Sequence, residues 1–353
     1  MSERTRMASF HVPEELNATA PPERRGIRRD HVKMLVLNRR TGFVSHSSFY
    51  RLDEHMKEGD LLVLNASRTI PAVLHGEWRR GGVVLGEGTE VRLARRRDDC
   101  SWQALVVSTE FRPLPGDSFA FKPLLSAEVT AEVTETSSQP LVTIAFSLQG
   151  ARLTDYLYAY AEPIRYEYIS HPWELDYYQT VYASAPGSVE MPSAGRAFSW
   201  ELLFKLKRQG VRIAYVQLHT GLSYIPEEGG HPDPRNNFEQ YEVPKETADA
   251  IIRTKKEGGR VVAAGTTVVR ALESAAGRDG EPAAGSGWTN LMIEASTPLR
   301  VVDGLISGFH EPEASHLEML SAFIEPGLLY DAYQEAIAYG YLWHEFGDIN
   351  VII

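Results

Sequence analysis

Apolar positions along the chain follow two different patterns. Short continuous apolar runs at residues 32–37 and 61–64 predict buried strands. Between about residues 72 and 150, apolar positions fall in short β-branched segments separated by turns that contain glycine or proline. These segments are residues 82–85, 90–93, 104–107, 129–133 and 141–146. A series of strands without helical spacing predicts a small all-β module, either a barrel or a sandwich.

Beyond residue 148, helical spacing alternates with strand-like runs. Helices are predicted at residues 200–208, 244–257, 266–276 and 327–341, and strands at residues 211–218, 260–264 and 349–353. This alternation favours a partly parallel sheet. We therefore predict an α/β fold: a large mixed α/β domain, built from residues 1–71 and 151–353, with a small all-β barrel domain inserted at residues 72–150. The polar, proline-bearing stretch up to about residue 29 predicts an irregular arm.

Composition and net charge then exclude several classes of protein and site. The 353 residues include 36 lysines and arginines against 47 aspartates and glutamates, a net charge of −11. This excludes a surface coated in positive charge for indiscriminate binding of nucleic acids or membranes. The single cysteine, Cys100, excludes a disulfide framework and a cysteine-based zinc site. No apolar run has the length of a signal peptide or a membrane span, so we expect a cytoplasmic protein, with a monomer favoured.

Local basic stretches remain compatible with that balance. Residues 24–40 contain seven lysines and arginines, and residues 92–97 contain four arginines. On an acidic protein this segregation fits a nucleic-acid face, and it fits a solvated run of charge equally well.

The first candidate for chemistry is Gly265-Thr266-Thr267, which joins a predicted strand to a predicted helix containing Arg270. The unpaired N–H groups at a helix start favour an anion or a carbonyl oxygen. The same pattern is typical of a helix capped by threonine without any ligand. It is not a P-loop, because the Gly-Lys-Ser/Thr ending is missing.

Eight of the sixteen tyrosines fall between residues 156 and 182. Among them, Tyr166 and Tyr168 flank Glu167 and follow Arg165. Aromatic faces beside an arginine suit stacking on a purine or another flat base. Structural tyrosines on strand faces are an equally good interpretation.

A loop at residues 187–198 carries Glu190, Pro192, Ser193, Gly195 and Arg196. The serines there fit simple helix caps, while the flanking charges fit a loop that faces substrate. A nucleophilic serine is disfavoured because the Gly-x-Ser-x-Gly elbow is absent.

The histidines form a further group. His219 directly follows a predicted strand, where α/β folds bind their ligands. His310, His316 and His344 lack the His-Glu-x-x-His spacing of a helical zinc site, so no metal is expected. A hydrogen-bonded structural histidine fits each position as well.

Together these segments resemble the S-adenosylmethionine:tRNA ribosyltransferase-isomerase family of queuosine biosynthesis. The resemblance runs from the Phe-His-Val-Pro-Glu-Glu-Leu segment at residues 10–16 to Phe346-Gly347-Asp348. The motifs between them are residues 59–65, Arg68 with Ile70-Pro71-Ala72, residues 178–183, residues 192–195, Leu218-His219, Gly265-Thr266-Thr267 with Arg270, and Phe309-His310 with Pro312.

The resemblance implies both a fold and a reaction. The family has an inserted β-barrel. Its members move the ribosyl moiety of S-adenosylmethionine onto the aminomethyl group of 7-aminomethyl-7-deazaguanine in the tRNA anticodon. Adenine and methionine leave, and epoxyqueuosine remains. S-adenosylmethionine and tRNA are thus the implied partners, and neither a metal nor a prosthetic group is implied.

The resemblance also suggests roles for the candidate residues. His219 or Glu190 would be the general base, Arg270 and the Gly265-Thr266-Thr267 helix start would hold the donor, and the tyrosines would stack on a base. Arg196 joins the predicted catalytic set, and Arg165, Arg196 and the pair His344-Glu345 would define the acceptor. The predicted substrate-binding set is Arg68, Arg165, Tyr166, Tyr168, Pro192, Ser193, Gly195, Gly265, Thr266, Thr267, Arg270, His310, His344, Glu345 and Asp348.

Departures from the family pattern leave two alternatives open. The usual Asn-Asp-Thr-Arg reads Asn-Ala-Ser-Arg at residues 65–68, and Arg196 and Ala197 stand where the family has leucine and histidine. Histidines are lost around Asn236-Asn237, whereas His316, Glu318, His344 and Glu345 replace apolar or small residues. The alternatives are a divergent enzyme that uses another acceptor and a catalytically silent ligand-binding protein.

Overall fold

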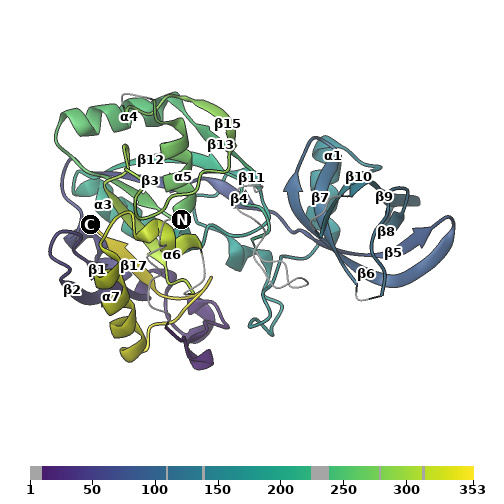
Figure 1. Cartoon of the computed structure of the whole chain (residues 1–353), viewed down its shortest axis with the longest axis horizontal. Helices are drawn as coiled ribbons and strands as arrows, with labels where there is room; N and C mark the ends of the chain where they lie inside the picture. Colours follow the sequence, from purple (N-terminus) through teal and green to yellow (C-terminus); the bar gives the residue numbers. More distant parts are fainter. Residues whose placement is uncertain (1–9, 109, 137–139, 224–237, 278–279, 312–314) are drawn as a thin grey trace, which may run out of the picture.

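The computed structural model describes residues 10–108, 110–136, 140–223, 238–277, 280–311 and 315–353. The chain forms a large α/β body and a smaller β-barrel that projects from one side of it (Figure 1). The mixed α/β fold with an all-β barrel is the predicted one. No helix in the described ranges is long and apolar enough to cross a membrane.

A nine-stranded mixed sheet forms the centre of the α/β body. Its order is β15 (Gly285–Thr289), β13 (Glu239–Val243), β12 (Arg212–Leu218), β3 (Leu61–Asn65), β14 (Val261–Ala264), β16 (Gly304–Gly308), β17 (Ile349–Ile352), β1 (Lys33–Leu37) and β2 (Val44–Ser48). Strands β12, β3, β14 and β16 are parallel neighbours. Their carboxyl ends therefore meet at one edge of the sheet.

Helices cover both faces of this sheet. On β3, Leu61 and Val63 pack into one core and Leu62 and Leu64 into the other, because successive strand residues point to opposite faces. The helices against the first core are α4 (Lys245–Lys256), α5 (Thr266–Ala275), α6 (Ser315–Leu320) and α7 (Pro326–Ala338). Helix α3 (Trp200–Arg208) packs into the second core. Burial on both faces explains why these strands read as continuous apolar runs.

The barrel closes in the order β10 (Leu141–Phe146), β7 (Ser101–Val107), β6 (Val83–Arg96), β5 (Val73–Arg80), β8 (Ser118–Leu124) and β9 (Ala127–Thr136). Helix α1 (Gly150–Tyr160) packs its apolar side against the barrel core. A two-stranded parallel sheet of β4 (Ser67–Thr69) and β11 (Ala185–Ser188) lies between the barrel and the large sheet (Figure 1).

The predicted elements that the structure contains differ from it mainly at their ends, whereas β2, β13, β16, α1 and α6 were not predicted. Helix α3 and strand β10 cover the predicted residues, and helices α4, α5 and α7 end within three residues of prediction. The segments predicted at 82–85 and 90–93 are one long strand, β6, because a register shift against β5 lets it continue across the intervening glycines.

Candidate active site

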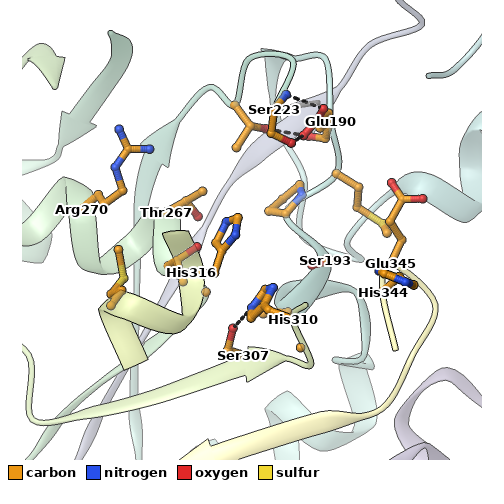
Figure 2. Close-up of a pocket in the computed structure, with 18 of the residues that line it drawn as sticks. Glu190, Ser193, Ser223, Thr267, Arg270, Ser307, His310, His316, His344 and Glu345 are labelled. Atoms are coloured by element: carbon orange, nitrogen blue, oxygen red, sulfur yellow. Dashed lines mark hydrogen bonds between the residues drawn. The ribbon is translucent and has the colours of Figure 1, made fainter. Parts of the chain in front are cut away.

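A cavity of about 490 Å³ lies at the edge of the sheet where the carboxyl ends of the central parallel strands meet. Its walls come from the residues that follow β12, β14 and β16, and from the loop that precedes Ser193 (Figure 2). Open α/β sheets bind ligands at this edge because loops and helix starts converge there. The position of the cavity therefore follows from the strand order.

One end of the cavity is formed by the start of helix α5. Gly265 has φ +101°, a conformation that residues with a side chain rarely adopt, and it turns β14 directly into the helix. Within the described residues no side chain caps this helix, and Thr266 and Thr267 line the cavity. The Asn65 amide, at the end of β3, donates to Thr267 Oγ1 over 3.3 Å. The helix start thus offers N–H groups to a ligand anion or carbonyl oxygen.

Arg270 lies one turn further along helix α5 and also lines the cavity. Its guanidinium forms an ion pair with Glu239, and its Nε donates to the Leu291 carbonyl over 3.1 Å. The other carboxylate oxygen of Glu239 accepts from the Gly221 N–H over 3.1 Å. Arg270 is therefore fixed in direction, with its charge largely balanced by Glu239.

The other end of the cavity contains two buried carboxyl groups. Glu190 accepts from the Ser223 N–H over 2.8 Å and from the Ser223 hydroxyl over 2.5 Å. Burial raises the pKa of Glu190 despite these donors. Burial, with the nearby Glu190 charge, raises the pKa of Glu345 to about 8. Figure 2 shows both carboxyl groups far from Arg270.

Three stacked rings line the wall beside these carboxyl groups. Tyr166 and Tyr168 are nearly parallel with centroids 5.8 Å apart, and Tyr168 stacks on His344 at 4.4 Å. His344 has φ +72°, which is strained for a residue with a side chain. Its Nε2 is hydrogen-bonded to Asn17 Oδ1 at 2.9 Å. A strained backbone held in this way is typical of functional sites.

A second ring pair lies on the β16 side of the cavity (Figure 2). His310 and His316 stack with centroids 4.5 Å apart, and His310 Nε2 is hydrogen-bonded to Ser307 Oγ at 2.8 Å. Burial lowers the pKa of His310 well below its usual value, so this imidazole is neutral at pH 7.

The structure brings most of the predicted site residues together around this cavity. Those that line it are Tyr166, Tyr168, Glu190, Pro192, Ser193, Gly265, Thr266, Thr267, Arg270, His310, His344 and Glu345. They come from five separate stretches of the chain. Asn236, Asn237 and Pro312 lie outside the described residues.

His219 lies behind the cavity wall, outside its lining. Its Nδ1 is hydrogen-bonded to Ser67 Oγ at 2.8 Å, and burial lowers its pKa. A Cβ atom at position 187 would come within 2.6 Å of the His219 imidazole, so only glycine there leaves room for this ring. Gly195 is likewise a packing residue, because a Cβ there would lie 2.3 Å from the Tyr182 hydroxyl.

Arg196 is also outside the lining of the main cavity. It is buried, its Nε donates to the Tyr177 carbonyl over 2.7 Å, and its Nη2 pairs with Glu23 at 2.8 Å. The guanidinium lies over the Phe346 ring at 5.2 Å. These contacts join the N-terminal arm to the loop before α3, which is a structural arrangement.

The remaining predicted site residues, Arg68, Arg165 and Asp348, lie outside the cavity lining. Arg68 lies on β4 outside the cavity lining, and Arg165 pairs with Glu162 at 3.0 Å. Asp348 is buried, and it accepts from the backbone N–H groups of Lys33 and Leu342, each over 2.7 Å. Asp348 thereby joins the start of β1 to the segment before β17.

Replacing Asp348 with alanine should lower the free energy of unfolding by about 2 kcal/mol, because two backbone N–H groups lose their acceptor. Urea unfolding followed by tryptophan fluorescence measures this, with the exposed Asp331→Ala on α7 as the control. Unchanged stability combined with weaker donor binding would instead support the substrate role predicted from the sequence.

Several lining residues were not predicted. Thr220, Ser223 and Ser307 are polar residues next to predicted positions, and Ser223 in particular supplies both donors to Glu190. Glu318 stands out in the sequence only as a departure from the family pattern, and His316 as such a departure and as one of the candidate histidines. Proximity to His219 and His310 was the available signal for Thr220 and Ser307.

The basic stretch at residues 24–40 is largely occupied by internal contacts. Arg25 donates to the Phe346 carbonyl, Arg28 pairs with Asp30, and Arg29 pairs with Glu23. Lys33 donates to the carbonyls of Tyr339 and Gly340. These contacts favour a structural role for the stretch over a nucleic-acid face.

Comparison with known protein families shows which family this chain belongs to. The model of the family described as "Queuosine biosynthesis protein" matches residues 5–352. The chain belongs to this family. The resemblance seen in the sequence motifs is therefore confirmed.

Relatives match over nearly the whole length. Proteins of Carboxydothermus hydrogenoformans and Heliobacterium modesticaldum, both named S-adenosylmethionine:tRNA ribosyltransferase-isomerase, are each 37% identical over 98% of both chains. A crystal structure of S-adenosylmethionine tRNA ribosyltransferase from Thermotoga maritima is 30% identical, with a TM-score of 0.55. That match covers 98% of this chain and 99% of the other.

Proposed function

We propose that this protein is an S-adenosylmethionine:tRNA ribosyltransferase-isomerase of queuosine biosynthesis. It moves the ribosyl moiety of S-adenosylmethionine onto 7-aminomethyl-7-deazaguanine in tRNA, releasing adenine and methionine and leaving epoxyqueuosine. The observation that carries the proposal is a single cavity, in a chain of this family, with an anion-binding helix start at one end and carboxyl groups beside stacked rings at the other.

The helix-start end of the cavity suits the donor. The N–H groups of Thr266 and Thr267 at the start of α5 match the carboxylate of the methionine portion, since a helix N-terminus stabilises negative charge. The Gly265 N–H is already bonded to the Ile306 carbonyl over 2.8 Å. Arg270 is held by Glu239, so its contribution is direction and hydrogen bonding more than net charge. S-adenosylmethionine is thus a co-substrate, and the mechanism uses no prosthetic group.

Of the two predicted general bases, we propose Glu190. The reaction requires removal of a proton from the carbon beside the sulfonium, whose positive charge acidifies that position. Glu190 lines the cavity, whereas His219 is bound to Ser67 behind it. A pKa raised by burial makes the Glu190 carboxylate a stronger base than an exposed glutamate. Its two bonds from Ser223 hold the carboxylate in one direction.

The stacked rings suit the acceptor base. Tyr166, Tyr168 and His344 form a flat aromatic wall at the end of the cavity that contains Glu190 and Glu345, where a 7-deazaguanine can stack. Their burial also limits water around reactive intermediates. The acceptor tRNA is a cytoplasmic molecule, and we accordingly propose a cytoplasmic protein.

The test is to incubate the protein with S-adenosylmethionine, with and without tRNA carrying 7-aminomethyl-7-deazaguanine. Adenine and methionine are quantified by mass spectrometry. We expect their release to depend on that tRNA. Donor binding without turnover would support a different acceptor, and absence of donor binding would support a catalytically silent protein.

A further inference from the structure

Glu345 is a carboxyl group without a role in the chemistry proposed above. It lines the cavity, and its Oε2 atom is buried with no hydrogen-bond partner among the described residues. Buried polar atoms are almost always paired, because an unpaired one loses its bonds to water without gaining others. Glu190, in contrast, is satisfied by two donors from Ser223. Glu345 is therefore the group at this end that lacks a donor.

The surroundings of Glu345 favour a positively charged donor. Among the described residues, the charged and titratable groups around it are Glu190, the hydroxyls of Tyr166, Tyr168 and Tyr178, and the neighbouring His344. Arg196 lines a smaller adjoining pocket with Glu345, and its guanidinium is paired with Glu23 at 2.8 Å. Arg270, already paired with Glu239, lies at the opposite end of the cavity (Figure 2). Two carboxyl groups close together in a buried site attract a cation strongly, because little solvent screens them.

We propose that Glu345 is the binding group for the primary ammonium of the acceptor, with Glu190 supplying a second negative charge beside it. The proposal rests on the proposed function, in which the acceptor carries an aminomethyl group. In the ring wall for the acceptor base, His344 directly precedes Glu345 in the sequence, and Tyr168 stacks on His344 and lies close to Glu345 in space. The helix start assigned to the donor lies at the other end of the cavity (Figure 2).

Binding at this site moves one proton. In the free protein at pH 7, Glu345 is mostly protonated, because its pKa is raised to about 8. An ammonium group stabilises the ionised carboxylate, so Glu345 gives its proton to solvent as the ammonium binds. No covalent bond other than this O–H bond breaks. Below pH 8, affinity for an ammonium ligand should therefore fall about tenfold for each pH unit.

The experiment is calorimetric titration with an anticodon stem-loop RNA carrying 7-aminomethyl-7-deazaguanine, against the same RNA carrying 7-methyl-7-deazaguanine. Repeating each titration at pH 7 in buffers of different ionisation enthalpy gives the protons released. We expect release of about 0.9 proton for the ammonium RNA, none for the methyl RNA, and affinity 10- to 100-fold tighter for the former.

Three variants complete the test. Glu345→Gln should abolish both the proton release and the preference for the ammonium RNA, and its affinity should not vary between pH 6 and 8. Glu345→Asp keeps the charge and should retain proton release with weaker affinity. Glu242→Gln, an exposed residue on β13, removes the same charge away from the cavity and should behave as the unchanged protein.

The outcomes separate this inference from the function on which it rests. Normal turnover with an unchanged ammonium preference in Glu345→Gln would overturn the inference alone. If the variant instead loses its preference for S-adenosylmethionine over the neutral thioether S-adenosylhomocysteine, the bound cation belongs to the donor and the acceptor assignment is wrong. If the unchanged protein neither binds the RNA nor releases adenine, the proposed function fails and the inference fails with it.

Discussion

Glu190→Gln should lower kcat for tRNA-dependent adenine release by about 10²- to 10⁴-fold, the usual contribution of a positioned general base. Glutamine retains the shape. Its amide oxygen can accept the bond from the Ser223 N–H and its amide N–H can donate to the Ser223 hydroxyl, so folding should be preserved. At saturating tRNA, where the pH dependence of acceptor binding through Glu345 no longer limits the rate, kcat of the unchanged protein should fall as the pH is lowered through the raised pKa of Glu190, and this acid limb should disappear from the residual kcat of the variant. Steady-state rates across pH measure both effects.

His219→Asn is the matched comparison for this variant. His219 lies behind the cavity, where asparagine can still bond to Ser67. We expect a loss of less than tenfold in kcat, arising from packing. If His219→Asn abolishes turnover while Glu190→Gln retains it, the base has been assigned to the wrong residue of the predicted pair.

Arg196→Ala should lower the free energy of unfolding by about 4 kcal/mol. The substitution leaves Glu23 with Arg29 as its remaining ion-pair partner and leaves the Tyr177 carbonyl without its donor. It also removes the guanidinium from the Phe346 ring. Each of the two lost hydrogen bonds involves the charged guanidinium, and such a bond contributes about 1.5–3 kcal/mol. Urea unfolding followed by tryptophan fluorescence provides the measurement.

The control for this prediction is Arg208→Ala, an exposed arginine in the last turn of α3, which should change stability by less than about 0.5 kcal/mol. Donor and acceptor preference should be unchanged in the fraction of Arg196→Ala that folds. A stable Arg196→Ala protein with altered acceptor preference would restore the substrate role predicted from the sequence.

The division into domains remains a prediction. The barrel strands begin at Val73 and end at Phe146, and helix α1 packs on the barrel although it follows residue 148. We propose that residues 72–150 form the inserted unit. Limited proteolysis that leaves a barrel fragment intact would support this boundary.

The sequence by itself determined the fold class, the order of the main elements and the family. Apolar periodicity is local, so α3 and β10 are predicted at their observed residues. The Gly265-Thr266-Thr267 helix start is equally local, because a strand, a glycine and a helix follow one another in the chain. Short family motifs carry the same kind of local information.

Only the tertiary structure decided which candidates share a cavity. Glu190 and Ser223 are 33 positions apart, and Arg196 and Glu23 are 173 apart, so no spacing rule could pair either couple. Tertiary packing places His219 and Arg196 outside the cavity lining, although both belong to family motifs. It also raised the pKa of Glu345, because desolvation and a neighbouring charge depend on what surrounds a carboxyl group in space.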